Sequence, residues 1–127
     1  MNKDANYAFY GTLRTGMENN LYYGSHALES RGIIQLKGYL LYSLGEYPYA
    51  IKTPDLNRVI TVELFHINDF SIEKEIHEME LSVDYYFEEV LFEEDLYGIY
   101  LFRTPREGDI LLQHGDWVKF MHTGLTF

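Results

Sequence analysis

"YAFYGTLRTG" (residues 7–16) is the stretch from which the fold of this chain can be inferred. Its first four residues have the aromatic character of a β-strand, and Gly11 follows them directly. Glycine permits the positive φ angles that a loop needs when several backbone N–H groups point into one cavity. By itself the stretch leaves two interpretations open: an ordinary turn that ends a strand, or a binding loop.

Strand-like segments recur through the rest of the chain. RVITVELFHI (58–67) alternates and is rich in β-branched residues, so it is the clearest strand prediction. The full set of predicted extended segments is 6–10, 32–44 with a bend at Gly38, 45–51 after a turn, 58–67, 84–94 and 96–104, with 115–121 closing the chain.

NDFSIEKEIHEMEL (68–81) is the one clear helix prediction, because Asn68, Asp69 and Ser71 can cap its start. Its core face is an apolar stripe at helical spacing, formed by Ile72, Ile76 and Met79. A shorter helix is expected within 16–31, ended by Gly32. One clear helix beside about six strands predicts an α+β fold with a curled sheet or a small barrel.

Two glutamates flank the apolar stripe of this helix, Glu75 on one side and Glu80 on the other. Glu78 is expected to point away toward solvent. A carboxyl group half-buried against apolar side chains has a raised pKa, which suits a general acid or base. Helix geometry selects these two carboxylates and does not choose between them.

The composition indicates a single domain over residues 1–127. The chain is 46% hydrophobic and 17% aromatic, carries a formal charge of −10 and has no cysteine. The charge argues against a nucleic-acid partner, and the lack of cysteine excludes disulfides and thiolate sites. With no secretory h-region and no apolar run near the ~20 residues of a membrane span, we expect a soluble cytoplasmic protein without a membrane role.

Motifs for metals and cofactors are missing. HEMEL (77–81) begins like a zinc-protease motif, but Leu81 stands where the second histidine belongs. Neither a dinucleotide-binding glycine motif, nor a P-loop, nor the nucleophile elbow of a hydrolase occurs in the sequence. We therefore expect no metal and no cofactor.

Five strings occur in an order that resembles one protein family. They are YGTLR (10–14), LYSLGEYPYAI (41–51), VITVELFHI (59–67), EIHEMEL (75–81) with Tyr86 after it, and HGDW (114–117). This order resembles the gamma-glutamylcyclotransferase-like superfamily, in its small bacterial and gamma-glutamylamine-cyclotransferase-like branch, over about residues 6–118. The resemblance implies a small mixed β-barrel flanked by a few helices.

The resemblance also implies a site. In active relatives the loop after the first strand forms one wall of a cavity, and its backbone N–H groups hold the glutamyl moiety. The matching residues here are Tyr10, Gly11, Thr12, Leu13 and Arg14, and Tyr86 is a further substrate-binding residue by the same resemblance. A glutamate that ends a Leu-Asp-x-x-Glu helix supplies the proton chemistry. That position is Glu80, so the resemblance selects it over Glu75.

The implied reaction needs neither cofactor nor metal. The α-amine of a small γ-glutamyl substrate attacks its own γ-carbonyl group, and a five-membered lactam, 5-oxoproline, forms as an amine departs. One carboxyl group handles the protons, and the cavity holds the reactive conformer and its oxyanion.

The chain departs from the family pattern at four positions. They are Val62, His77, Leu81 and Glu88, where the family commonly has glycine, aspartate, glycine and arginine. Leu81 is expected to narrow the mouth of the cavity. The departures motivate an alternative to an enzyme, an inactive module that binds a γ-glutamyl compound or another small ligand on the same scaffold.

Overall fold

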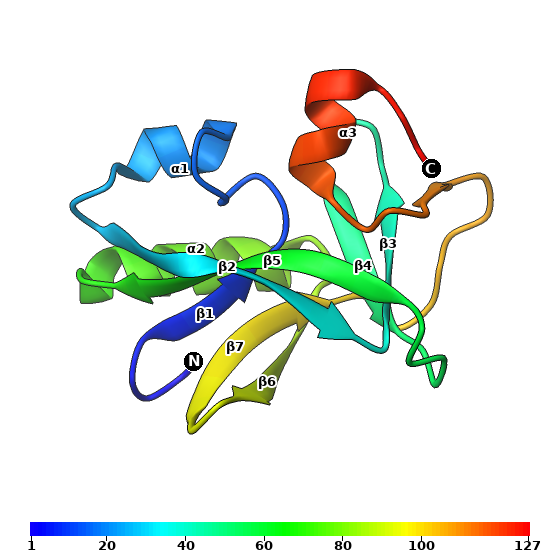
Figure 1. The fold of residues 1–127 in the computed structure, drawn as a ribbon. Helices are drawn as coiled ribbons and strands as arrows, with labels where there is room; N and C mark the ends of the chain where they lie inside the picture. The colour runs from blue at the N-terminus through cyan, green and yellow to red at the C-terminus, as the bar shows by residue number, and fades with distance from the viewer.

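The computed structural model describes residues 1–127, and Figure 1 shows its elements. In chain order they are β1 (Asn6–Phe9), α1 (Glu18–Tyr23), β2 (Leu28–Lys37), β3 (Tyr39–Ser43), β4 (Pro48–Lys52), β5 (Val59–Ile67), α2 (Phe70–Ser82), β6 (Tyr86–Phe92), β7 (Asp95–Leu101), β8 (Ile110–Leu112) and α3 (Trp117–Thr123). The predicted α+β class is confirmed. The short β8 was not among the predicted strands.

The strands form a five-stranded sheet in the order β2-β5-β1-β7-β6 and a three-stranded sheet in the order β4-β3-β8. β1 lies at the centre of the larger sheet, antiparallel to β5 and parallel to β7, so the sheet is mixed. The two sheets do not close into a barrel, and the expected barrel is wrong in this respect. Gly38, with a φ of 87°, lets the chain bend out of β2 so that β3 enters the second sheet instead.

Successive residues of β1 face two different hydrophobic clusters, as strand periodicity requires. Tyr7 and Phe9 belong to the cluster that includes Ile76 of α2, whereas Ala8 and Tyr10 belong to the cluster that includes Trp117 of α3. Both β1 and β5 are buried along nearly their whole length. The strand that leads into the YGTLR loop is therefore held firmly from both sides.

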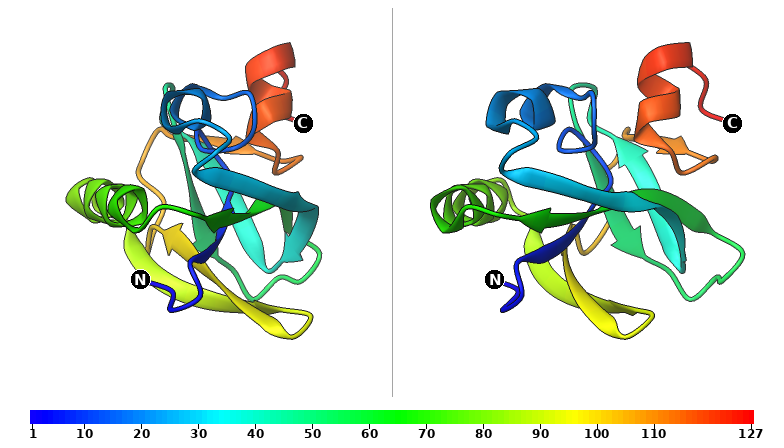
Figure 2. Two further views of the ribbon diagram at one scale, coloured as in Figure 1. Left: turned by 90° about the vertical axis from the view of Figure 1, so that its left-hand side faces the viewer. Right: turned by 60° about the vertical axis from the view of Figure 1, so that its left-hand side comes forward.

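α2 begins after Asp69, whose side chain accepts hydrogen bonds from the N–H groups of Ser71 at 2.9 Å and Ile72 at 3.2 Å. This confirms the predicted start. The helix lies along one side of the larger sheet, as Figure 2 shows. Its last turn consequently reaches the end of β1 where the loop begins.

The other two helices correct the predictions. α1 ends at Gly24, not at Gly32, because Gly24 adopts a φ of 85° and donates to the carbonyl of Asn20. The residues from Leu28 on already belong to β2. The closing segment is helical, since the side chain of Asp116 caps α3 by accepting from the N–H of Lys119. None of the helices has the length and apolar character needed to cross a membrane.

Candidate active site

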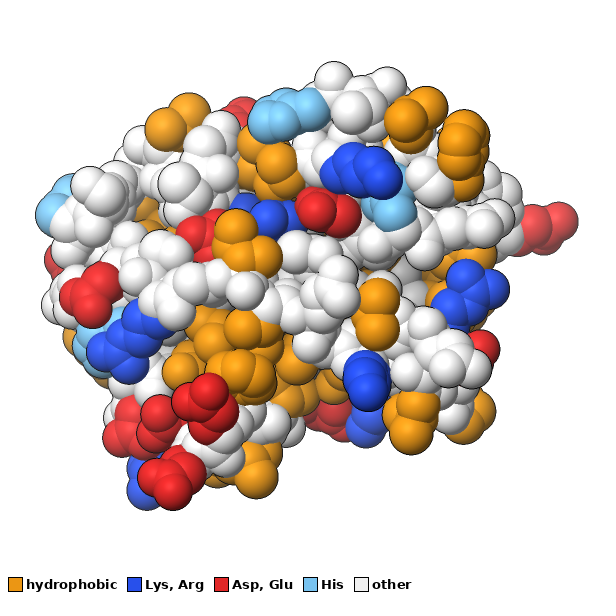
Figure 3. Space-filling model, in the orientation of Figure 1, with side chains coloured by type: hydrophobic (Ala, Val, Ile, Leu, Met, Phe, Trp, Pro, Cys, Tyr) orange, Lys and Arg blue, Asp and Glu red, His pale blue; other side chains and the backbone are white.

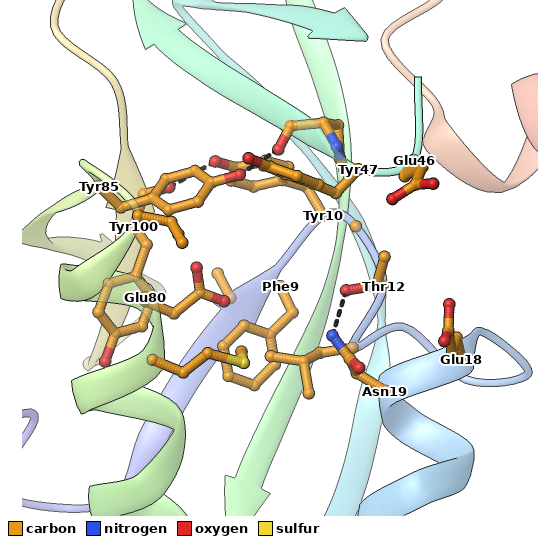
Figure 4. Close-up of a pocket in the computed structure, with 16 residues that line it drawn as sticks. Phe9, Tyr10, Thr12, Glu18, Asn19, Glu46, Tyr47, Glu80, Tyr85 and Tyr100 are labelled. Carbon is orange, nitrogen blue, oxygen red and sulfur yellow. Dashed lines mark hydrogen bonds between the residues drawn. The ribbon is translucent and has the colours of Figure 1, made fainter. Parts of the chain in front are cut away.

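A cavity of about 260 Å³ opens between the end of β1, α1, the turn before β4 and the last turn of α2 (Figure 4). Its sixteen lining residues are Ala8, Phe9, Tyr10, Gly11, Thr12, Leu13, Glu18, Asn19, Glu46, Tyr47, Pro48, Met79, Glu80, Val83, Tyr85 and Tyr100. The cavity thus brings together four of the five predicted loop residues and Glu80.

The loop uses its carbonyl groups and leaves the amides of residues 11–13 free. The carbonyls of residues 11, 12, 13 and 14 accept hydrogen bonds from Arg14, Asn19 and Asn20, the Asn20 side chain, and Met17, respectively. The N–H groups of residues 11, 12 and 13 donate to no acceptor in the protein. In a trans peptide the C=O of one residue and the N–H of the next point in opposite directions. The N–H groups of residues 12 and 13 therefore point away from the groups that bind the carbonyls of residues 11 and 12, and they remain available to a ligand.

Gly11 contributes close approach, not a positive φ. The φ angle of Gly11 is not positive, so the prediction that this loop needs a positive φ at Gly11 is wrong. A Cβ atom built on Gly11 would lie 2.8 Å from Cγ of Pro48, much nearer than carbon atoms approach. A side chain at this position would push the loop away from Pro48, which lines the same cavity.

Glu80 directs its carboxyl group into the cavity (Figure 4). This side chain accepts no hydrogen bond and forms no ion pair within the protein. Although the residue as a whole keeps some contact with solvent, burial of the carboxyl raises its pKa from 4.5 to about 7. A group with this pKa exchanges protons readily at neutral pH.

Glu75, the other carboxylate that helix geometry selected, is exposed and lies outside the cavity wall. Its only hydrogen bond is a long one of 3.4 Å from the hydroxyl of Tyr23. Glu78 is exposed beside Lys74, as expected. Of these three carboxylates, only Glu80 reaches the cavity.

Tyrosine rings form much of the remaining wall. Tyr10 is buried, donates to the carbonyl of Tyr100 at 2.5 Å and accepts from the N–H of Ala50 at 3.1 Å, so it ties the end of β1 to β7 of the same sheet and to β4 of the second sheet. The hydroxyl of Tyr85 donates to the carbonyl of Pro48. These bonds give the cavity a rigid frame.

Four further tyrosines near the cavity differ in their positions. Tyr23 and Tyr49 pack in the core, and Tyr22 is exposed. Tyr47 is the one that lines the cavity.

Arg14 lies behind the loop and does not line the cavity. Its guanidinium is buried, pairs with Asp116 at 2.7 Å and lies 4.0 Å from Glu63. Glu63 in turn accepts from the backbone and hydroxyl of Thr15 at 2.8 and 2.6 Å, and from Ser30. Arg14 and Glu63 thus hold the far end of the loop against β5 and α3.

Tyr86 also lies outside the cavity wall, and its ring carries the guanidinium of Arg103 at 4.1 Å.

The four departures from the family pattern leave the cavity untouched. Val62 is buried in the core, and Glu88 pairs with Lys52 at 3.2 Å. Leu81 is 45% exposed and does not narrow the mouth, because its side chain leaves the helix on the solvent side. His77 faces the sheet and contacts Tyr100. None of the four lines the cavity.

Sequence reasoning missed a buried polar cluster beneath Glu80. Glu73 is buried and accepts a 2.5 Å hydrogen bond from the hydroxyl of Tyr7. The ring of Tyr7 stacks on that of Tyr100, with centroids 6.2 Å apart. The signal was present, since Glu73, His77 and Glu80 have the i, i+4, i+7 spacing of one helix face.

Nowhere in the chain do three or more His, Cys, Asp or Glu side chains gather in a way that could hold a metal ion.

The sequence matches the model of one protein family, described as "Gamma-glutamyl cyclotransferase, AIG2-like", over residues 7–119. The chain belongs to this family. The match includes all sixteen residues that line the cavity. The resemblance inferred from YGTLR and the strings after it is thereby confirmed. A comparison with curated proteins gave no match.

Solved structures share the fold of this AIG2-like gamma-glutamyl cyclotransferase family member. The uncharacterized protein PH0828 from Pyrococcus horikoshii superposes with a TM-score of 0.75 at 24% identity, covering 94% of this chain and 97% of its own. Protein c4763 of uropathogenic E. coli gives 0.74 at 18% identity, covering 94% and 96%. Protein ytfP from Escherichia coli gives 0.69 at 22% identity, covering 89% and 96%. At these identities the likeness concerns the fold alone.

Proposed function

We propose that this protein cleaves the amide bond of a γ-glutamyl amine or γ-glutamyl amino acid, releasing 5-oxoproline and a free amine, with Glu80 as general acid and base. One observation carries the proposal: the unpaired carboxyl of Glu80 and the unpaired amides of residues 11–13 border the same cavity. Membership in the AIG2-like gamma-glutamyl cyclotransferase family supports the same reaction class.

The reaction begins with the α-ammonium group of the bound substrate. The carboxylate of Glu80 removes a proton from it, and the freed nitrogen lone pair forms a bond to the γ-carbonyl carbon. The electrons of the C=O bond move onto oxygen, and this oxyanion accepts hydrogen bonds from the free N–H groups of the loop. Nucleophile and carbonyl belong to one molecule, so holding its coiled conformer lowers much of the barrier.

Collapse of the tetrahedral intermediate breaks the bond to the leaving nitrogen. Over the whole reaction two protons pass from the α-nitrogen to that leaving nitrogen, because an ammonium becomes a lactam N–H and an amide becomes an ammonium. Glu80 can carry each proton by alternating between carboxylate and carboxylic acid. Its pKa of about 7 makes both forms accessible at neutral pH.

The proposal is tested by incubating purified protein with a panel of γ-glutamyl amines and γ-glutamyl amino acids and measuring 5-oxoproline. We expect Glu80→Gln to lower turnover by about 10²–10⁴-fold. Glu75→Gln is the matched control, since Glu75 is exposed on the same helix, and we expect its activity to equal that of the unmodified protein.

A folded protein that releases no 5-oxoproline from the whole panel would overturn the proposed reaction. If the same compounds raise its melting temperature without being consumed, the result favours the inactive binding module instead.

A further inference from the structure

Glu73 differs from the other acidic residues in its surroundings. Of the twenty Asp and Glu residues in the chain, only Glu63 and Glu73 are buried as whole residues. The others lie wholly or partly at the surface, and Figure 3 shows on one face how such side chains gather over the end of the β6–β7 hairpin. Glu63 lies beside the guanidinium of Arg14, whereas Glu73 forms no ion pair. The side chain of Glu73 has one hydrogen-bond partner in the protein, the hydroxyl of Tyr7.

Stability alone does not account for this pair. Moving a carboxyl group out of water costs free energy, and a single hydrogen bond from a neutral hydroxyl offsets only part of it. Burial and the neighbouring carboxyl of Glu73 raise the pKa of Tyr7, so its hydroxyl keeps the proton and donates it. Glu73→Met and Tyr7→Phe together would fill similar space without a buried carboxyl. The pair therefore suggests a role in geometry.

Tyr7 occupies a place from which it can fix α2 relative to the cavity wall. Its ring stacks on those of Phe9 and Tyr100, with centroids 5.6 and 6.2 Å away, and both of these residues line the cavity. Gly98 lies opposite Tyr7 in β7, and a Cβ atom there would approach Cδ1 of Tyr7 to 2.9 Å. The ring of Tyr7 is thus closely packed on the sheet, and its hydroxyl is a fixed point for the helix.

α2 has a second polar contact with the same sheet, from His77 to the hydroxyl of Tyr100. Glu73, His77 and Glu80 lie on one helix face. At the helical rise the two contacts are about 6 Å apart along the axis, and Glu80 follows about 4.5 Å beyond His77. The apolar contacts of α2 are not directional. The two polar contacts together therefore fix the axial position and the rotation of the helix.

We propose that Glu73 and Tyr7 are positioning residues for Glu80. Their hydrogen bond joins the first turn of α2 to β1 and so keeps the carboxyl of Glu80 in the cavity that the free amides of residues 11–13 border. As a statement about catalysis the inference rests on the proposed function. As a statement about the placement of Glu80 it can be tested without turnover.

The double variant Tyr7→Phe/Glu73→Met removes both partners, so that no buried carboxyl is left unpaired. The other bond it loses is the long one of 3.3 Å from the N–H of Asn2 to Tyr7. We expect the double variant to stay folded by circular dichroism, with a urea midpoint close to or above that of the unmodified protein. A displacement of about 1 Å can lower a rate about 100-fold, so kcat should fall at least about tenfold while KM stays within about threefold. Both are measured as 5-oxoproline release from the most reactive γ-glutamyl amide of the panel.

A second measurement does not depend on turnover. The pKa of about 7 at Glu80, followed by NMR titration of its side-chain carboxyl, should fall toward 4.5 in the double variant, because a displaced carboxyl gains water. Glu73→Gln is the matched control, since it removes the charge and keeps a carbonyl oxygen that can accept from Tyr7. We expect it to retain the raised pKa of Glu80 and a kcat within about threefold. Lys74→Met, at an exposed position of the same helix, should change neither.

A double variant with unchanged kcat and an unchanged pKa at Glu80 would overturn the inference. So would a double variant that no longer folds, since the pair would then be structural, or a folded Glu73→Gln variant as impaired as the double variant. If the double variant consumes γ-glutamyl amides as fast as the unmodified protein, the inference fails and the proposed reaction stands. If no amide is consumed and the pKa of Glu80 falls in the double variant but not in Glu73→Gln, the proposed reaction fails and the placement of Glu80 by this pair stands.

Discussion

The Nδ1 atom of His77 lies 2.7 Å from the hydroxyl oxygen of Tyr100, one helical turn before Glu80. The ring of Tyr100 lines the cavity, whereas its hydroxyl points away from the cavity toward His77 (Figure 4). Burial lowers the pKa of His77, so the contact involves a neutral imidazole at pH 7. This pair links the position of α2 to the cavity wall beside the carboxyl group of Glu80.

Tyr100→Phe keeps the ring and removes the hydroxyl. We expect the free energy of unfolding to fall by about 1 kcal/mol, and kcat to fall while KM changes little, because Glu80 is held less firmly. Urea denaturation and steady-state kinetics measure the two effects. Tyr22→Phe is the control, since Tyr22 is 76% exposed. An unchanged kcat in Tyr100→Phe would contradict the positioning role.

The charged carboxylate of Glu80 should lower the free energy of unfolding at high pH. Its pKa rises from 4.5 to about 7 on folding, so the native state binds more protons between these values and stability declines as pH rises through them. Above pH 7 the cost reaches about 3 kcal/mol. We therefore expect Glu80→Gln to be more stable than the unmodified protein at pH 8, and equally stable near pH 4, in chemical denaturation. Equal stability at pH 8 would show that the carboxyl is well solvated.

The same carboxyl should set the pH dependence of the rate. The proposed reaction begins with the carboxylate form of Glu80, so log kcat/KM should rise with pH and level off above about 7. Initial rates in overlapping buffers check this. A rising limb centred near 4.5 would contradict the raised pKa.

Arg14→Met should destabilise the protein by about 3 kcal/mol, because it leaves the buried carboxylate of Glu63 without its nearest cation. Lys52→Met is the comparison. It also removes the cation from an ion pair, the one between Lys52 and Glu88, but this pair is largely exposed. We expect its effect to stay below about 1 kcal/mol. Urea denaturation compares the two, and equal losses would show that Arg14 does not fasten the loop.

Gly11→Ala should lower activity more than stability, since the new methyl group meets the ring of Pro48 at the cavity wall. Pro48→Ala removes the ring atoms that it would meet. The double variant should therefore recover part of the activity that Gly11→Ala loses, measured as 5-oxoproline release. A double variant that is no better than Gly11→Ala would argue against this contact as the cause.

Local signals in the sequence predicted much of the fold. Alternation marked β5, the cap at Asp69 marked α2, and Gly38 marked the bend between β2 and β3. The closing helix was missed because Trp117 and its neighbours form only two turns, too few for a clear period.

Contacts between distant segments were harder to predict. The choice of Glu80 over Glu75 needed the family resemblance, because only the packing of α2 decides which of the two sides faces the cavity. The roles of Gly11 and Arg14 depend on Pro48 and Asp116, residues that no local pattern connects to the loop.

The placement of β1 has a consequence for biosynthesis. β1 occupies the centre of the larger sheet, and both of its neighbours, β5 and β7, are synthesised after it. During synthesis β1 has no complete strand partner until Ile67 has been added, and its second partner is complete only at Leu101. Such dominance of non-local pairing makes folding slow and exposes the nascent chain to aggregation, so this protein should depend on chaperones that shield its N-terminal segment during synthesis.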